Sequence, residues 1–106
     1  MFKLNHEVQP VACEPGVSRK VLVHNETLMV CEIAFTAGAQ GNTHSHPHTQ
    51  VSYLIRGKLR FTIGDDVMDL GPGDTALIPP DTAHGVLALE DSMLVDVFHP
   101  MREDFV

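Results

Sequence analysis

Turn-forming residues divide this chain into short runs of strand-favouring residues, and this division constrains the fold more than any other feature. Branched and aromatic side chains are concentrated in the runs, whereas glycine, proline, asparagine and aspartate separate them. Helical periodicity is almost absent. So many strands within 106 residues predict one all-β domain, residues 1–106, built as a sandwich or barrel. The predicted strands are 19–24, 28–37, 50–56, 58–63, 67–70, 75–79, 84–90 and 92–99.

The segments between these runs carry explicit turn signals. Gly64-Asp65-Asp66 is typical of a hairpin, and Gly71-Pro72-Gly73-Asp74 is typical of a second tight reversal. The stretch AGAQGN (37–42) is predicted as a further break between strands.

Composition excludes several classes of function. The formal net charge is −7 and no basic patch is visible, so a nucleic-acid partner is not expected. No apolar run approaches the roughly 20 residues of a membrane helix, and the first residues do not form a secretory signal. We therefore expect a cytoplasmic protein in which Cys13 and Cys31 stay reduced, with Cys31 buried as a small apolar residue.

A histidine cluster predicts a metal site. His44, His46, His48 and Gln50 follow one another at two-residue spacing, which in a strand would place them on one face. His84 comes much later, at the start of another apolar run. We expect His44, His46, His84 and the amide oxygen of Gln50 to bind one divalent ion with open positions, as catalytic metal sites have. His48 follows Pro47, and its part in metal binding stays open.

This donor set does not select one metal. Three imidazoles and one amide suit Ni²⁺, Zn²⁺, Mn²⁺ or Fe²⁺. A neutral amide also leaves more positive charge on the ion than a carboxylate would, and it cannot act as a base. Any general acid or base must then come from elsewhere in the barrel.

The last predicted strand offers such a group. Leu94, Asp96 and Phe98 share one face of run 92–99. If this face lines the interior, Asp96 is a carboxylate in a dry cavity, with a raised pKa and a position suited to proton transfer. The alternative is that Asp96 faces outward or forms a structural pair.

Two arginines are candidates for holding an anionic substrate. Arg102 follows Pro100 and can fold over the barrel mouth, where a guanidinium can bind a carboxylate with two hydrogen bonds. The alternative for Arg102 is an ion pair with Glu103 or Asp104. Arg60 is expected to share an outer face with Lys58, and whether it contacts substrate stays open.

The spacing of these residues resembles the two sequence motifs of the cupin family. The first motif, G-x5-H-x-H-x3-E-x6-G, matches in every spacing, with Gln50 in place of glutamate. The second, G-x5-P-x-G-x2-H-x3-N, also matches in spacing, with Asp81 in place of glycine and Ala88 in place of asparagine. The resemblance covers about residues 30 to 99 and implies a cupin-type double-stranded β-helix, or jelly-roll barrel, with a bound metal. The matching residues are Gly38, His44, His46, Gln50 and Gly57 in the first motif and Gly73, Pro79 and His84 in the second.

A finer resemblance covers most of the chain. The segments GDTALIPPDTAHGV and VFHPMREDF are similar to those of the KdgF family of pectin degradation proteins. This resemblance implies conversion of 4,5-unsaturated monouronates from pectin or alginate into linear keto sugars. It implies metal ligands at His44, His46, Gln50 and His84, and catalytic residues at Asp96, Phe98 and Arg102.

Two other functions compete with this one. Small cupins also act as metal-dependent dioxygenases, and some bind sugars without catalysis. The sequence leaves open which sugar source is preferred, and whether the ring opens directly or after hydration. Apolar residues on both faces of 28–35 and 92–99 further predict a homodimer, as cupins of this kind usually form.

Overall fold

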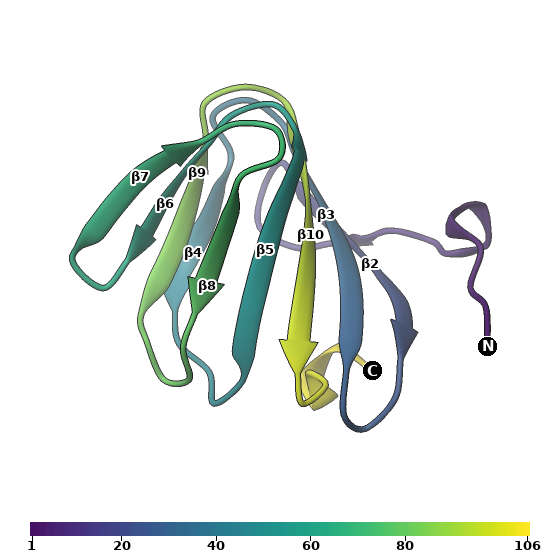
Figure 1. The fold of residues 1–106 in the computed structure, drawn as a ribbon. Coiled ribbons are helices and arrows are strands. Elements are labelled where there is room, and N and C mark those ends of the chain that lie inside the picture. Colours follow the sequence, from purple (N-terminus) through teal and green to yellow (C-terminus); the bar gives the residue numbers. More distant parts are fainter.

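Two antiparallel sheets make up almost all of the regular structure in the computed structural model, which describes residues 1–106. The larger sheet has the strand order β1-β2-β3-β10-β5-β8, and the smaller has the order β4-β9-β6-β7. The two sheets face each other (Figure 1) and enclose one hydrophobic core, so the all-β prediction is confirmed. The strands are β1 (Val11–Ala12), β2 (Val17–His24), β3 (Met29–Phe35), β4 (Gln40–His44), β5 (Thr49–Arg56), β6 (Leu59–Ile63), β7 (Asp66–Leu70), β8 (Thr75–Ile78), β9 (His84–Ala88) and β10 (Ser92–His99).

Alternation of side chains along the strands builds the core. In β3 every second residue is buried, from Met29 to Phe35, and β10 repeats this pattern from Ser92 to Phe98. Such alternation places one face of each strand in the interior. The strand register sets Asp96 of β10 opposite Cys31 of β3 on one side and Ser52 of β5 on the other. Polar groups thus enter the core near its centre.

The prediction of a break at 37–42 is partly wrong, because β4 begins at Gln40. Its residues are mostly exposed, and backbone pairing with β9 holds it in place. A strand without an apolar face gives no periodic signal. The single-strand interpretation of the histidine stretch is wrong as well, since β4 ends at His44 and residues 45–48 form a connection to β5.

The predicted turns are confirmed. Gly64 lies between β6 and β7, and the reversal at 71–74 separates β7 from β8. Asp81, which replaces the glycine of the second cupin motif, has a φ of 61°, a left-handed conformation that aspartate tolerates better than most residues. The Asp81 N–H donates to the carbonyl of His46 at 2.8 Å. This turn therefore holds the histidine-bearing connection.

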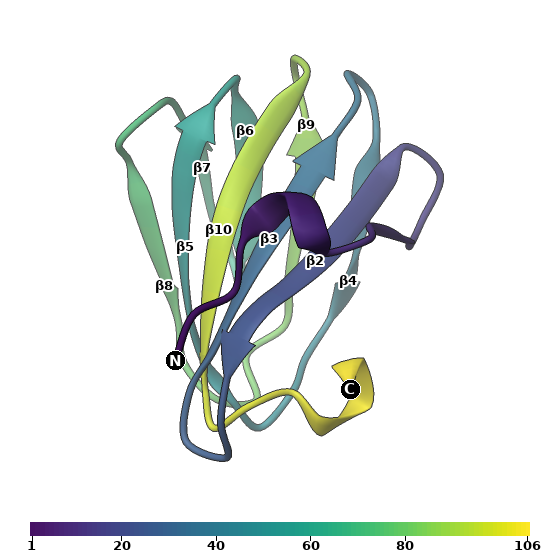
Figure 2. The same ribbon diagram turned by 90° about the vertical axis from the view of Figure 1, so that its right-hand side faces the viewer.

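The two termini lie on different parts of the molecule. The N-terminal segment, with the short 3-10 turn η1 (Asn5–Glu7), crosses the outer face of the larger sheet (Figure 2), where Asn5 donates to Glu32 at 3.1 Å. The C-terminal segment ends in η2 (Glu103–Phe105), at the end of the sheets where β4 leads into β5 (Figure 1). No helix in the structure has the length and apolar character needed to cross a membrane.

Candidate functional site

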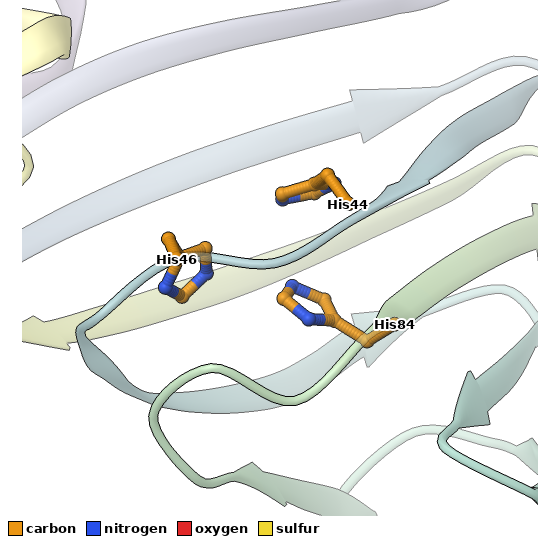
Figure 3. A group of neighbouring side chains, drawn as sticks. All are labelled: His44, His46 and His84. Carbon is orange, nitrogen blue, oxygen red and sulfur yellow. The ribbon is translucent and has the colours of Figure 1, made fainter.

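Three histidines from separate parts of the chain lie around one space. His44 ends β4, His46 lies in the connection after it, and His84 begins β9 (Figure 3). One ring nitrogen from each lies within 4.8 Å of the others, close enough to hold one metal ion. β4 and β9 are paired with His44 opposite His84, so sheet register brings together residues far apart in sequence.

Backbone hydrogen bonds orient two of the three rings. His44 Nδ1 donates to the carbonyl of Asn42 at 2.8 Å, and His84 Nδ1 donates to the carbonyl of Thr82 at the same distance. With the proton held at Nδ1, Nε2 keeps its lone pair for a ligand. His84 Nε2 is buried and has no hydrogen-bond partner. An unpartnered buried nitrogen aimed at its neighbours fits a metal ligand.

Burial keeps two of the imidazoles uncharged. It lowers the pKa of His46 to about 4 and also lowers the pKa of His84. Only a neutral imidazole can donate a lone pair to a metal. The chemistry of this cluster therefore fits a divalent ion.

Gln50 connects the histidines to the interior carboxylate. Its Oε1 lies 2.9 Å from His46 Nε2, about the separation of two adjacent ligands on one ion. Its Nε2 donates to Ser52 Oγ and to Asp96 Oδ1, each at 3.1 Å. Because a carboxylate only accepts, the amide nitrogen must face Asp96 and the amide oxygen must face His46.

Asp96 is buried on the inner face of β10, as its apolar neighbours in sequence predict. Burial raises the pKa of its carboxyl to about 6, although hydrogen bonds from Ser52 and Gln50 oppose the shift. Both donors reach Oδ1, and Oδ2 receives no hydrogen bond from the protein. Asp96 therefore offers one free oxygen to the cavity that it lines.

The C-terminal segment brings Arg102 to the same cavity. Its guanidinium is buried, lies 5.2 Å from the centre of the Phe98 ring and 4.2 Å from that of Phe105, and lines the cavity. Nε and Nη2 donate to the two carboxylate oxygens of Asp104, at 3.1 and 3.0 Å. Arg102 thus both reaches the barrel mouth and forms the local ion pair that was the alternative prediction. The Phe98 ring packs edge-on against His46, with the ring centres 5.8 Å apart.

Other polar candidates lie outside this cluster. His48 Nε2 is 3.1 Å from the carbonyl of Met101, and its ring does not belong to the three-histidine group. Arg60 is exposed and paired with Asp69, as its predicted outward position requires. Both cysteines are free thiols; Cys31 is buried as predicted, and burial raises its pKa to about 12.

Sequence reasoning missed Arg19. It lies on β2 between the core residues Val17 and Val21, and it lines the cavity with Asp96 and Arg102. The alternation of side chains along β2 could have revealed Arg19. In a strand, a residue two positions from each of two inward valines also faces inward.

The cavity that joins these groups has a volume of about 310 Å³. This is at the small end of the roughly 300–1,000 Å³ typical of small-molecule sites. Apolar walls come from both sheets, and the polar groups converge on one region. The polar lining includes His44, Gln50, His84, Asp96, Arg19 and Arg102. The space suits a small polar ligand of about one sugar ring.

Comparisons with known proteins agree with this geometry. The cupin domain family matches residues 31–98. The pectin degradation protein KdgF of Dickeya dadantii is 34% identical over 93 residues, which cover 86% of this chain and 84% of that protein.

Solved structures give the same result. The structure of KdgF from a Halomonas species is 37% identical, with a TM-score of 0.95 over 100% of this chain and 98% of that chain. An RmlC-like cupin from Shewanella frigidimarina is 34% identical, with a TM-score of 0.95 over 99% of this chain and 95% of that chain. The chain therefore belongs to the cupin family and, within it, to the KdgF family of pectin degradation proteins.

Proposed function

We propose that this protein converts 4,5-unsaturated monouronates, released from pectin or alginate, into linear keto sugars. The observation that carries the proposal is a buried carboxylate, Asp96, with one free oxygen in the cavity that His44 and His84 of the histidine cluster also line. Kinship with a pectin degradation protein supports the substrate class.

The reaction is an isomerisation. The substrate is a cyclic hexuronate whose ring oxygen joins a hemiacetal carbon, C1, to the C4=C5 double bond. Loss of the proton from the anomeric hydroxyl makes C1 a carbonyl and breaks the bond from C1 to the ring oxygen. The enolate left at C5 becomes a ketone when C4 gains a proton. One proton leaves and one enters, so no co-substrate is required.

Asp96 is the group suited to both proton transfers. We assign its Oδ2 to accept the anomeric proton and to deliver a proton to C4, while Ser52 and Gln50 hold Oδ1. A pKa raised to about 6 lets the carboxyl exchange protons near neutral pH.

Phe98 and Arg102 are assigned to binding. The Phe98 ring would form the apolar wall beside the sugar, and Arg102 would hold the substrate carboxylate with the N–H groups that Asp104 leaves free. Holding the sugar in a fixed orientation beside Asp96 lowers the entropic part of the activation barrier.

We assign His44, His46, Gln50 and His84 to one divalent ion, which is Ni²⁺, Zn²⁺, Mn²⁺ or Fe²⁺. When bound, such an ion supplies a Lewis acid that stabilises negative charge developing on a sugar oxygen. We further propose that residues 1–106 act as one domain, that the protein is a homodimer, and that it works in the cytoplasm.

Proton NMR in deuterium oxide tests the proposal. The metal-loaded protein should convert an unsaturated galacturonate to a linear ketone that carries deuterium at C4, and an oxygen electrode should record no uptake. Oxygen consumption with another substrate, and no turnover of the uronate, would instead favour a dioxygenase. Binding of the uronate without turnover would favour a non-catalytic sugar-binding protein.

A further inference from the structure

Arg19 occupies a position where a charged side chain is unusual. It lies on β2, between Val17, which is buried, and Val21, which packs against the core. Its guanidinium carbon lies 3.7 Å from the centre of the Phe105 ring, and the residue lines the cavity. Arginine seldom faces the interior of a protein unless its charge is paired with an acid or serves a functional site.

The charge of Arg19 is unpaired. The ion pairs of this chain join Arg60 to Asp69 and Arg102 to Asp104, and neither includes Arg19. Its Nε is buried without any hydrogen-bond partner. A buried donor without an acceptor is costly, so a site for an anion or hydroxyl oxygen is expected beside it.

The guanidinium of Arg102, in contrast, already has an ionic partner. Two of its nitrogens donate to Asp104, which neutralises its charge before any ligand enters. Both guanidinium groups pack against the same ring, that of Phe105, and both residues line the cavity, so a ligand in the cavity would lie near both charges. Among the charged residues that line the cavity, the others are Glu14 and Asp96, which would repel an anion.

We propose that Arg19 binds the carboxylate of the sugar together with Arg102, and that it is the residue which selects acidic sugars over neutral ones. This inference rests on the proposed function for the class of substrate. It adds a specificity-determining residue from β2, whereas Asp96 and Phe98 come from β10. A guanidinium without a partner gains the most from an incoming carboxylate, because nothing must be displaced to free it.

Binding of saturated sugars tests the inference without turnover. Isothermal titration calorimetry on the metal-loaded protein should show that D-galacturonate binds more tightly than D-galactose. The substitution Arg19→Met keeps an unbranched apolar stem on Phe105 but removes the charge. It should weaken galacturonate binding by roughly 10-fold to 100-fold and leave galactose binding unchanged. Arg60→Met, which removes an exposed cation from the outer surface, should change neither.

A second variant separates binding from folding. Arg19→Lys keeps the charge but loses the planar fork, so galacturonate affinity should fall between wild type and Arg19→Met. If Arg19 only supports the fold, Arg19→Lys and any folded Arg19→Met protein will retain the wild-type preference for galacturonate, and the inference is overturned. A wild-type protein that binds galactose as well as galacturonate overturns it too.

The inference and the proposed function can fail separately. Normal turnover of the unsaturated uronate with an unchanged KM in Arg19→Met would overturn the role of Arg19 and leave the reaction intact. Absence of turnover in wild type, with galacturonate binding that depends on Arg19, would overturn the reaction and support Arg19 as the carboxylate-binding residue.

Discussion

Gln50 links the metal-binding half of the site to the proton-transfer half. Its amide oxygen faces His46 and its amide nitrogen donates to Asp96. Glutamate, the usual residue of the cupin motif, could not donate this hydrogen bond and would set two carboxylates side by side. Like charges at that distance do not both stay ionised in a buried site. The departure from the motif therefore lets the Asp96 carboxyl ionise in the interior without a second carboxylate beside it.

Replacing Gln50 by glutamate tests this link. Gln50→Glu should keep a full complement of metal, since a carboxylate is at least as good a ligand. Turnover should fall by roughly 10-fold or more, because repulsion from Glu holds a proton on one carboxyl of the pair. Metal analysis beside kcat measures both effects. Wild-type kcat in Gln50→Glu would show that the amide is not needed.

The metal assignment is tested by removing one imidazole. His46→Ala should lose stoichiometric metal in elemental analysis, because only two of the three clustered nitrogens remain. His48→Ala is the matched control, because His48 is two positions from His46 in sequence but lies outside the cluster. Its loss should leave the metal content unchanged. One metal per chain in purified His46→Ala would disprove the ligand set.

Residue spacing predicted the part of the site that depends on local sequence. The spacing of His44, His46 and His84 led to a cluster that the structure brings together. Arg19 was not among the predicted site residues, although its two-residue spacing from Val17 and Val21 places it on the inner face of β2.

At the scale of elements, apolar strands were predictable and polar ones were not. β10 alternates buried and outward residues along its whole length, so its inner face could be identified from sequence. β4 has no apolar face, and its existence depends on backbone bonds to β9, where the paired residues lie 40 to 47 positions later in sequence. Pairing of that kind leaves no periodic trace in the strand itself.

The C-terminal segment is the element that completes the cavity. All ten strands end by His99, and the segment after it adds Arg102 and Phe105 to the lining. We therefore expect the strands to bind the metal and the C-terminal segment to contribute part of the affinity for substrate.

Arg102→Ala should therefore act on substrate capture more than on chemistry. A carboxylate clamp works in both the ground state and the transition state, so KM should rise by a larger factor than kcat falls. Steady-state kinetics with an unsaturated monouronate measures the split, and Arg60→Ala, on the outer surface, should leave both constants unchanged. A large fall in kcat at constant KM would instead place Arg102 in the chemical step.

On the scale of the whole molecule, the outer face of the larger sheet carries an apolar patch on β5, β8 and β10. Strand register sets Val51 of β5 between Val97 of β10 and Leu77 of β8, and it sets Tyr53 beside Val95. Val51, Tyr53 and Leu77 are exposed. A continuous patch of this kind on a small protein is typical of a subunit interface.

Light scattering tests the homodimer. The wild-type protein at micromolar concentration should have about twice the 11.6 kDa mass of one chain. Val51→Lys should give monomers that still bind metal, because a charge in an apolar interface is costly. Val67→Lys, at an exposed position on β7 of the other sheet, should remain dimeric. A wild-type mass near that of one chain would exclude the dimer.

Loss of ultraviolet absorbance from an unsaturated monouronate tests the central claim most directly, because ketonisation destroys the double bond conjugated to the carboxylate. Wild-type protein and Asp96→Asn should be compared at equal metal content, since asparagine keeps the shape and can still accept from Gln50. The absorbance should fall rapidly with wild type and roughly 10²–10⁴-fold more slowly with Asp96→Asn. A wild-type rate equal to that without protein would contradict the proposed reaction. Near-full activity in Asp96→Asn would contradict the proton-transfer role while leaving the fold and the metal site intact.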